Sequence, residues 1–176
     1  MPSPLGHALG GVICALALGG DSPARRAGAI RERWRDPLVG AAAVAAVVPD
    51  LDFLWGRHNM ETHSLGAALA AGLAVLLCTR GRAWRLAAVV TTAWVSHVLF
   101  DWLGSDDTPP LGVMALWPLS PAFYFAHAFV FEAISRRYWL PGFWTHNLGA
   151  VLSEAVMLAP IAGALALWRG RPSSAP

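Results

Sequence analysis

Residues 85–104 read RLAAVVTTAWVSHVLFDWLG, and this stretch decides the fold because it combines two features that rarely occur together. It is long and apolar enough to cross a bilayer as one helix, which takes roughly 20 residues. It also carries His97 and Asp101, which are four residues apart and therefore share one face of that helix. Ionisable groups inside a bilayer are costly unless they are paired, hydrated or bound to metal. The stretch therefore predicts a membrane helix that holds a polar site near one end.

The composition of the whole chain agrees with a membrane protein. The 176 residues are 56% hydrophobic and 14% charged, whereas soluble domains carry about 25% charged residues. This length fits one membrane-embedded domain, which we place at residues 1–171, followed by a disordered tail at residues 172–176. The net charge is only +2, and the absence of a basic patch with interleaved aromatic residues argues against a nucleic-acid partner.

Four other apolar segments have about the length of a membrane span. The five predicted spans are Pro4–Gly20, Pro37–Trp55, Ser64–Thr79, Arg85–Gly104 and Asn147–Trp168. Their orientation follows from the arginines, since positively charged loops stay in the cytoplasm. With five spans, all three arginine-rich loops, at residues 25–35, 80–85 and 169–171, lie in the cytoplasm and the N-terminus lies outside.

A sixth apolar stretch, Pro118–Ser135, is ambiguous. If it also crossed the bilayer, Arg169 and Arg171 would lie outside, against the distribution of the other arginines. We therefore expect an amphipathic or re-entrant helical segment at the outer face, with Arg136 and Arg137 at the lipid headgroups. The predicted fold class is all-α, a polytopic membrane helical bundle with about five transmembrane helices and this additional segment.

Histidines and acidic residues gather at the end of the spans that is opposite the arginine-rich loops. The set consists of His7, Asp50, Asp52, His58, His63, His97, Asp101 and Glu154. Each of them alone is most simply a cap, a turn former or an interfacial residue. Together they predict a metal site, because mixed histidine and carboxylate ligands suit zinc and similar divalent metals. A proton-relay pathway is the alternative that this pattern leaves open.

Two acidic positions in this set need separate comment. Asp50 and Asp52 would point about 200° apart on a continuous helix, so either the helix frays there or only one of them binds the metal directly. Glu154 is the only acidic residue of the last predicted span, and its depth of roughly 10 Å matches that of His97. We expect Glu154 to belong to the site. The alternative is a neutral glutamate bonded to a hydroxyl or a backbone carbonyl between helices.

The order of these motifs resembles a known family. His7, Pro49-Asp50-Leu51-Asp52, His58, Thr62-His63-Ser64 and Ser96-His97-Val98-Leu99-Phe100-Asp101 are similar to the motifs of the YdjM-type membrane-bound metal-dependent hydrolases, whose founding member is LexA-regulated. Asp101–Ser105 and Leu116-Trp117-Pro118 also resemble that family, and the likeness runs from His7 to around Trp144. Asn59 and Met60 stand where the family has Arg and often Gly, a departure that bears on His58 more than on His63.

The resemblance implies a bacterial inner-membrane enzyme, and the distribution of the arginines predicts that its site faces the non-cytoplasmic side. The family is in turn distantly similar to zinc-dependent phospholipase C and to single-strand-specific zinc nucleases, which cleave phosphate esters. It implies one to three divalent ions, zinc by preference, with metal ligands drawn from His7, Asp50, Asp52, His58, His63, His97 and Asp101. Metal-activated water would then hydrolyse phosphate esters of lipid or lipid-like substrates, with Asp52 or Glu154 as general base.

Other residues on the same side are compatible with more than one role. The aromatic-rich segment Trp117–Trp144 predicts either an anchor at the membrane interface or the wall of a lipid entrance. Arg57 could hold a phosphate or reach the lipid headgroups. His127 and His146 are expected to be structural.

Two other functions compete with hydrolysis. A transporter or metal-handling protein should carry its polar groups near the middle of the membrane, and here they lie towards one face. A structural protein whose metal only joins helices would use the same ligands. A catalytic metal keeps an open coordination position, whereas a structural metal does not.

Overall fold

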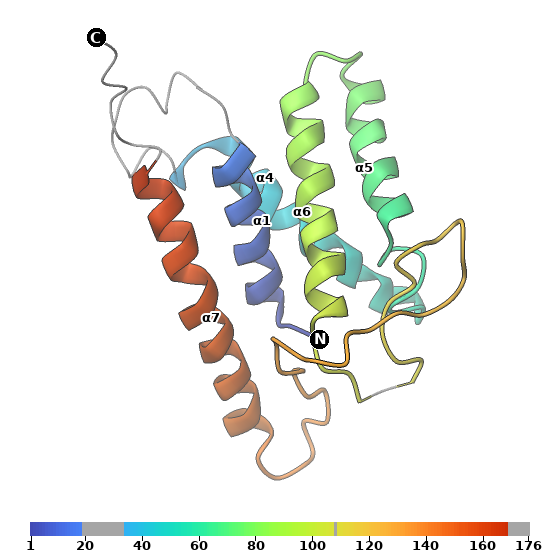
Figure 1. Cartoon of the computed structure of the whole chain (residues 1–176), viewed down its shortest axis with the longest axis vertical. Coiled ribbons are helices and arrows are strands. Elements are labelled where there is room, and N and C mark those ends of the chain that lie inside the picture. Colours follow the sequence, from blue (N-terminus) through green and yellow to red (C-terminus); the bar gives the residue numbers. More distant parts are fainter. Residues whose placement is uncertain (19–33, 108, 169–176) are drawn as a thin grey trace.

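The computed structural model describes residues 1–18, 34–107 and 109–168, and it is helical (Figure 1). The helical elements are α1 (Pro4–Leu18), α4 (Pro37–Ala45), the 3-10 helix η1 (Val48–Trp55), α5 (Leu65–Cys78), α6 (Trp84–Trp102) and α7 (Phe143–Trp168). No β-strand occurs within these ranges, so the all-α prediction is confirmed. The predicted tail at residues 172–176 lies outside the described residues.

Side-chain caps explain where two of the helices begin. Asp36 accepts a hydrogen bond from the backbone N–H of Leu38 at 2.9 Å, and Pro37 occupies the first position of α4. Ser64 accepts from the backbone N–H of Ala67 at 3.0 Å and caps α5 in the same way. Both starts agree with the predicted spans because these caps are local signals in the sequence.

The second predicted span is not one continuous α-helix. It ends as α-helix at Ala45 and resumes at Val48 as the tighter η1, whose second residue is Pro49. The backbone N–H of Asp50 donates to the carbonyl of Val47 at 3.1 Å, the spacing of a 3-10 helix. In an α-helix that N–H would bond to the carbonyl of Ala46 instead. The break therefore leaves the Ala46 carbonyl available to another partner.

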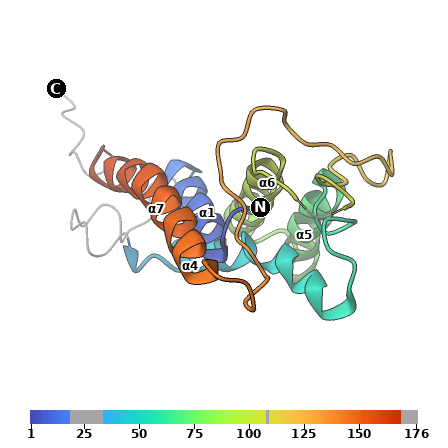
Figure 2. The same cartoon turned by 90° about the horizontal axis from the view of Figure 1, so that it is seen from below.

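The helices pack closely because their contact faces are made of small residues. Helix α1 lies at the centre and contacts α4, α6 and α7, while α5 packs on α6 (Figures 1 and 2). A Cβ atom on Gly11 would lie 2.3 Å from the Ala42 carbonyl oxygen, so only glycine permits this approach of α1 to α4. Ala15, Ala42, Ala93 and Ala162 are buried in the same core. Small residues at helix contacts are typical of membrane bundles.

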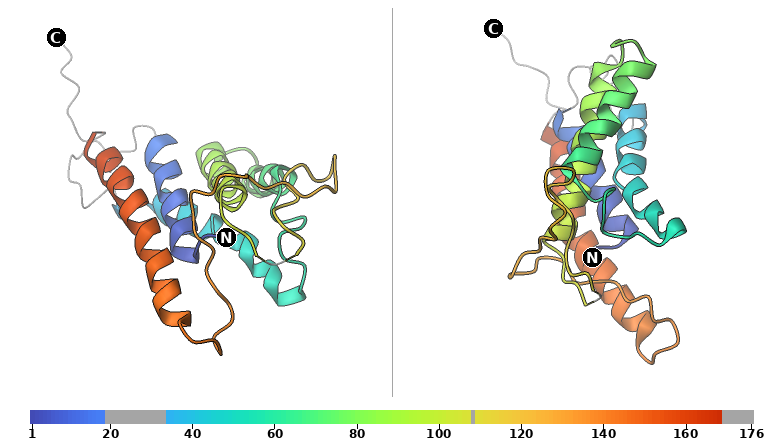
Figure 3. Two further views of the ribbon diagram at one scale, coloured as in Figure 1. Left: turned by 60° about the horizontal axis from the view of Figure 1, so that its bottom comes forward. Right: turned by 90° about the vertical axis from the view of Figure 1, so that its right-hand side faces the viewer.

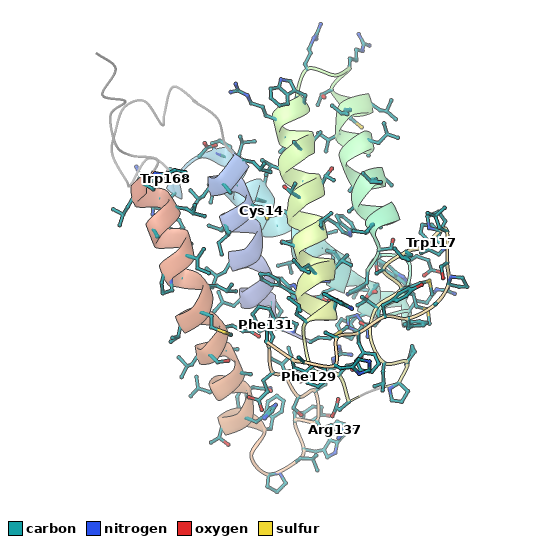
Figure 4. All side chains as sticks on the ribbon, viewed as in Figure 1. Cys14, Trp117, Phe129, Phe131, Arg137 and Trp168 are labelled. Carbon is teal, nitrogen blue, oxygen red and sulfur yellow. The ribbon has the colours of Figure 1, made fainter. Side chains whose placement is uncertain are left out.

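The outward faces of the helices are apolar. Leu69 on α5 is 65% exposed and Val156 on α7 is 73% exposed, whereas Glu154, one half-turn away, is fully buried. Figure 4 shows Trp168 at one end of the bundle and Phe129 and Arg137 towards the other. Apolar flanks between two aromatic ends fit a chain that is surrounded by lipid.

Two segments are long and apolar enough to cross a membrane, Pro37–Trp55 and α7. Helices α1 and α5 are apolar but shorter. Helix α6 has sufficient length, but Arg85, His97 and Asp101 lower its hydropathy, so our prediction that this stretch is apolar enough to span is not met. Helices α1, α5, α6 and α7 lie side by side in one bundle, and the short α4 continues into η1 beside them (Figures 1 and 3).

The prediction of a helical segment at Pro118–Ser135 is wrong. These residues form turns and irregular chain that pass across the lower end of the bundle (Figures 1 and 2). Two isolated backbone bridges fix the path, Gly104 with Phe131 and Val113 with Tyr124. Pro118 and Pro121 lack the N–H donors that a helix needs, which overrides the apolar character of the stretch.

Candidate metal centre

Four separate parts of the chain deliver imidazoles and carboxylates to one end of the bundle. His7 comes from the first turn of α1, Asp50 and Asp52 come from η1, and His97 and Asp101 come from the last turns of α6. The chain between η1 and α5 adds His58 and His63. The structure thus brings together all seven residues that we predicted as metal ligands. They form three overlapping groups, His7–His97–Asp101, Asp50–His63–His97 and Asp52–His58–His63.

The Asp101 carboxylate lies at the middle of this arrangement. Its Oδ2 lies 2.9 Å from His97 Nε2 and 3.4 Å from His63 Nε2, and its Oδ1 lies 3.3 Å from His7 Nε2. Asp50 Oδ1 approaches the same nitrogens of His63 and His97 at 3.5 and 3.8 Å. Three Nε2 atoms and two carboxylates therefore face one small volume. All but Asp50 have at most 1% of the residue surface exposed.

These atoms approach one another without forming hydrogen bonds of good geometry. His7 Nε2, His63 Nε2, His97 Nε2 and both carboxylate oxygens of Asp101 are buried and have no hydrogen-bond partner. A buried polar atom left without a partner costs about 1–3 kcal/mol. Several such atoms aimed at one point are expected where a cation is bound. Three imidazole nitrogens with carboxylates are a donor set that zinc and related divalent metals accept, so the residues fit the metal that we predicted.

The other ring nitrogen of each central histidine is fixed from behind. His97 Nδ1 donates to the Ala46 carbonyl at 2.7 Å, the carbonyl that the helix break leaves free. His63 Nδ1 lies 3.1 Å from both Asp52 Oδ2 and Thr62 Oγ1. Since a carbonyl or carboxylate can only accept, each Nδ1 carries a proton, which leaves Nε2 as the nitrogen that can bind a metal. This is the state in which histidine binds metal.

Asp52 is engaged on both of its oxygens. Its Oδ1 lies 2.7 Å from His58 Nδ1, and its Oδ2 accepts from Thr62 Oγ1 at 2.7 Å in addition to the contact with His63. The residue is fully buried. His58 Nε2 is buried and has no hydrogen-bond partner, and its ring lies on the outer side of the cluster.

The potential in this region is strongly negative. Burial by itself would lower the pKa of His63, yet Asp50 and Asp52, with Asp101 beside them, raise that pKa to about 9. The carboxylates therefore favour positive charge at the position of the His63 ring by more than burial disfavours it. A divalent cation would satisfy the same potential.

Glu154 lies elsewhere, and our expectation that it belongs to the site is corrected. Its Oε1 accepts from the backbone N–H of Ser3 at 2.8 Å, and its Oε2 accepts from the Ser3 hydroxyl. The Ser3 hydroxyl in turn accepts from the backbone N–H of Gly6 at 3.1 Å. Glu154 thus secures the start of α1 to α7. Its partners are a hydroxyl and a backbone amide rather than the His97–Asp101 pair.

Three further residues also lie outside the cluster. Arg57 pairs with Glu61 on an exposed loop, with Nε and Oε2 3.3 Å apart. His146 bonds to the Ala133 carbonyl at 2.8 Å, and the His127 ring packs against Phe125. The structural roles expected for the two histidines agree with these contacts.

A cavity of about 260 Å³, which the sequence did not predict, adjoins the cluster. Asp50 and His58 contribute to its wall, and Phe53, Asp106 and Arg136 also line it. The available signal was the position of Arg136, which with Arg137 is the exception to the cytoplasmic placement of the arginines.

One comparison with known proteins gives a match. The family model described as YdjM inner membrane protein matches residues 1–171. No curated protein and no solved structure matches the chain. The likeness to zinc-dependent phospholipase C therefore stays a prediction.

Proposed function

Because the chain belongs to the YdjM inner membrane protein family, we propose that it is a membrane hydrolase that depends on a divalent metal ion, by preference zinc. The observation that carries this proposal is the convergence of three buried Nε2 atoms and the Asp101 carboxylate, none of which has a hydrogen-bond partner. When bound, such a metal supplies Lewis acidity and lowers the pKa of water from its bulk value towards about 7.

The residues divide into ligands and residues that position them. His7, His63 and His97 would hold the metal through Nε2, together with Asp101 and Asp50. Asp52 orients His63 and His58 from behind, because both of its oxygens already receive contacts. We therefore propose that Asp52 positions the histidines and does not act as the general base that we expected from the sequence.

Proton transfer then falls to His58. Its Nδ1 is held by Asp52, its Nε2 has no partner, and the residue lines the cavity beside the cluster. A carboxylate behind an imidazole fixes the tautomer and stabilises the protonated ring, which suits a general base or acid. The departure from the family pattern after His58 agrees with a role that differs from metal binding.

We further propose that the chain crosses the membrane five times with this site on the non-cytoplasmic side. Arg80 and Arg82 lie in the loop between α5 and α6, at the end opposite the cluster, as cytoplasmic arginines should (Figure 1). A site at the outer membrane face, open to a cavity, suits phosphate esters of lipid or lipid-like molecules.

The test is metal analysis coupled to hydrolysis. Detergent-purified protein should contain divalent metal, and it should hydrolyse a phosphodiester such as bis(p-nitrophenyl) phosphate or phospholipids in vesicles. A chelator should abolish this activity, and added zinc should restore it.

His97→Ala should lose both metal and activity, because it removes a buried ligand and leaves the Asp101 oxygen beside it without a partner. His146→Ala is the matched control. This exposed histidine lies in α7, and its side chain contacts only Ala133 and Glu132 in the chain that precedes the helix. Full metal content in His97→Ala would refute the centre as drawn. Metal without hydrolysis of any substrate would favour the structural or metal-handling alternative.

A further inference from the structure

The cavity beside the metal centre has two arginines, Arg136 and Arg137, at its rim. It lies between η1, the chain around Asp106 and the segment around Arg136, and it shares Asp50 and His58 with the cluster. A molecule in this cavity would contact both the centre and the rim. The side chains at the rim therefore help to determine which substrates can bind at the metal centre.

Arg136 is held over an aromatic ring at this rim. Its guanidinium carbon lies 3.9 Å from the centre of the Phe53 ring, which is close enough for a cation–π contact. The Phe53 ring stacks on the other side against His58, with 3.9 Å between centroids and 19° between planes. The three side chains form a continuous stack from the rim of the cavity to the edge of the metal centre.

Arg136 is also free of the ion pairs that occupy its neighbours. Arg137 pairs with Asp107 at 3.7 Å, and Arg57 pairs with Glu61. Within the described ranges the Arg136 side chain forms neither an ion pair nor a hydrogen bond. Partial burial lowers the pKa of Arg136, but arginine remains charged under all ordinary conditions. A positioned, charged and unpaired guanidinium is available to bind an anion.

We infer that Arg136 recognises a phosphate group in this cavity, next to the metal centre. The inference rests on the proposed function and names the part of the substrate that this side chain holds. A guanidinium presents two parallel N–H donors that match two phosphate oxygens. Stacking on Phe53 fixes the plane of that fork.

The carboxylates around the cavity make this recognition dependent on metal. Asp50, Asp106 and Asp107 line it with Arg136, Arg137 and Met1, which carries the N-terminal amine, so the positive groups do not outnumber the carboxylates. Asp106 accepts from the backbone N–H of Gly112 at 2.9 Å, which holds it in place. An anion should therefore bind well only after a divalent cation has reversed this balance.

The experiment measures binding of inorganic phosphate by isothermal titration to detergent-purified protein, with and without zinc. We expect binding that requires zinc, and about a tenfold or greater loss of affinity in Arg136→Gln, the size of effect that a charge-assisted hydrogen bond produces. Arg136→Lys should recover only part of it, because lysine keeps the charge without the fork. Arg57→Gln, which breaks the exposed pair with Glu61 and removes an arginine that does not line the cavity, is the matched control and should stay within about twofold.

Each variant is also assayed for zinc content and thermal unfolding, both of which should match wild type. Nanodiscs containing phosphatidic acid form a second arm. If Arg136→Gln loses binding only to the phosphatidic acid nanodiscs, the phosphate that Arg136 recognises belongs to a lipid headgroup. If Arg136→Gln loses binding to inorganic phosphate as well, the site also accepts soluble phosphates. Wild-type phosphate affinity of Arg136→Gln in both arms would overturn the inference. Because binding is read without turnover, absence of hydrolysis in wild type would count against the proposed function only.

Discussion

Replacing Asp52 by asparagine removes the charge from a buried carboxylate that receives contacts from His58, Thr62 and His63. Asparagine keeps one acceptor oxygen and replaces the other with an N–H₂ donor. At least one of the three contacts is then lost. If the amide faces His63 Nδ1, it favours the tautomer with the proton on Nε2, which cannot bind metal.

The size of the effect follows from the place of Asp52 behind the ligands. Loss of such an orienting contact lowers metal affinity or activity by about 10- to 100-fold, equivalent to about 1.4 to 2.7 kcal/mol. Removal of a true ligand would cost more and would reduce the number of ions bound. For Asp52→Asn we therefore expect weaker zinc binding with unchanged stoichiometry at saturation.

Competition against a chelator of known affinity measures this directly. Glu61→Gln is the matched control, because it lies in the same loop but only pairs with Arg57 at the surface. Lower stoichiometry in Asp52→Asn at saturating zinc would show that Asp52 is itself a ligand. Unchanged affinity would show that its contacts with His63 do not set the geometry of the centre.

Two other outcomes are expected. Glu154→Gln should keep wild-type zinc content and activity. Glu154→Ala should lower the thermal midpoint, because it leaves the buried Ser3 N–H without a partner at a cost of about 1–3 kcal/mol. Loss of zinc in Glu154→Gln would show that Glu154 belongs to the site. Cysteines introduced at Arg82 and Tyr138, both exposed and at opposite ends of the bundle, should be labelled by an impermeant reagent from opposite sides of the membrane. Labelling of both from one side would contradict the proposed orientation.

Features encoded locally could be predicted from the sequence. The start of α5 follows from the Ser64 cap, and the shared face of His97 and Asp101 follows from their spacing on α6. The gathering of the seven residues at one end could also be predicted. The positions of the arginines predict the direction of each span, and that direction predicts the end of the bundle at which the polar residues of the span lie.

Features that depend on pairing between distant segments could not be predicted. Glu154 has a buried partner at Ser3, far away in the chain, and nothing in either local sequence indicates that choice. The opposite error occurred at Pro118–Ser135, where apolar composition suggested a helix that the prolines prevent. The neighbourhood of Arg136 depends on this irregular chain, so its stack on Phe53 appears only in three dimensions.

The dispersal of the metal-binding side chains has a consequence for how the protein is made. His7 leaves the ribosome with the first helix, but Asp101 follows only at the end of α6. His97 moreover takes its orientation from the Ala46 carbonyl, which is exposed only once the chain has bent ahead of Pro49. No partial translation product holds the complete set, so metal loading should come late in biogenesis. The helices would then enter the bilayer before these histidines bind metal, and the metal would bind only to the fully assembled bundle.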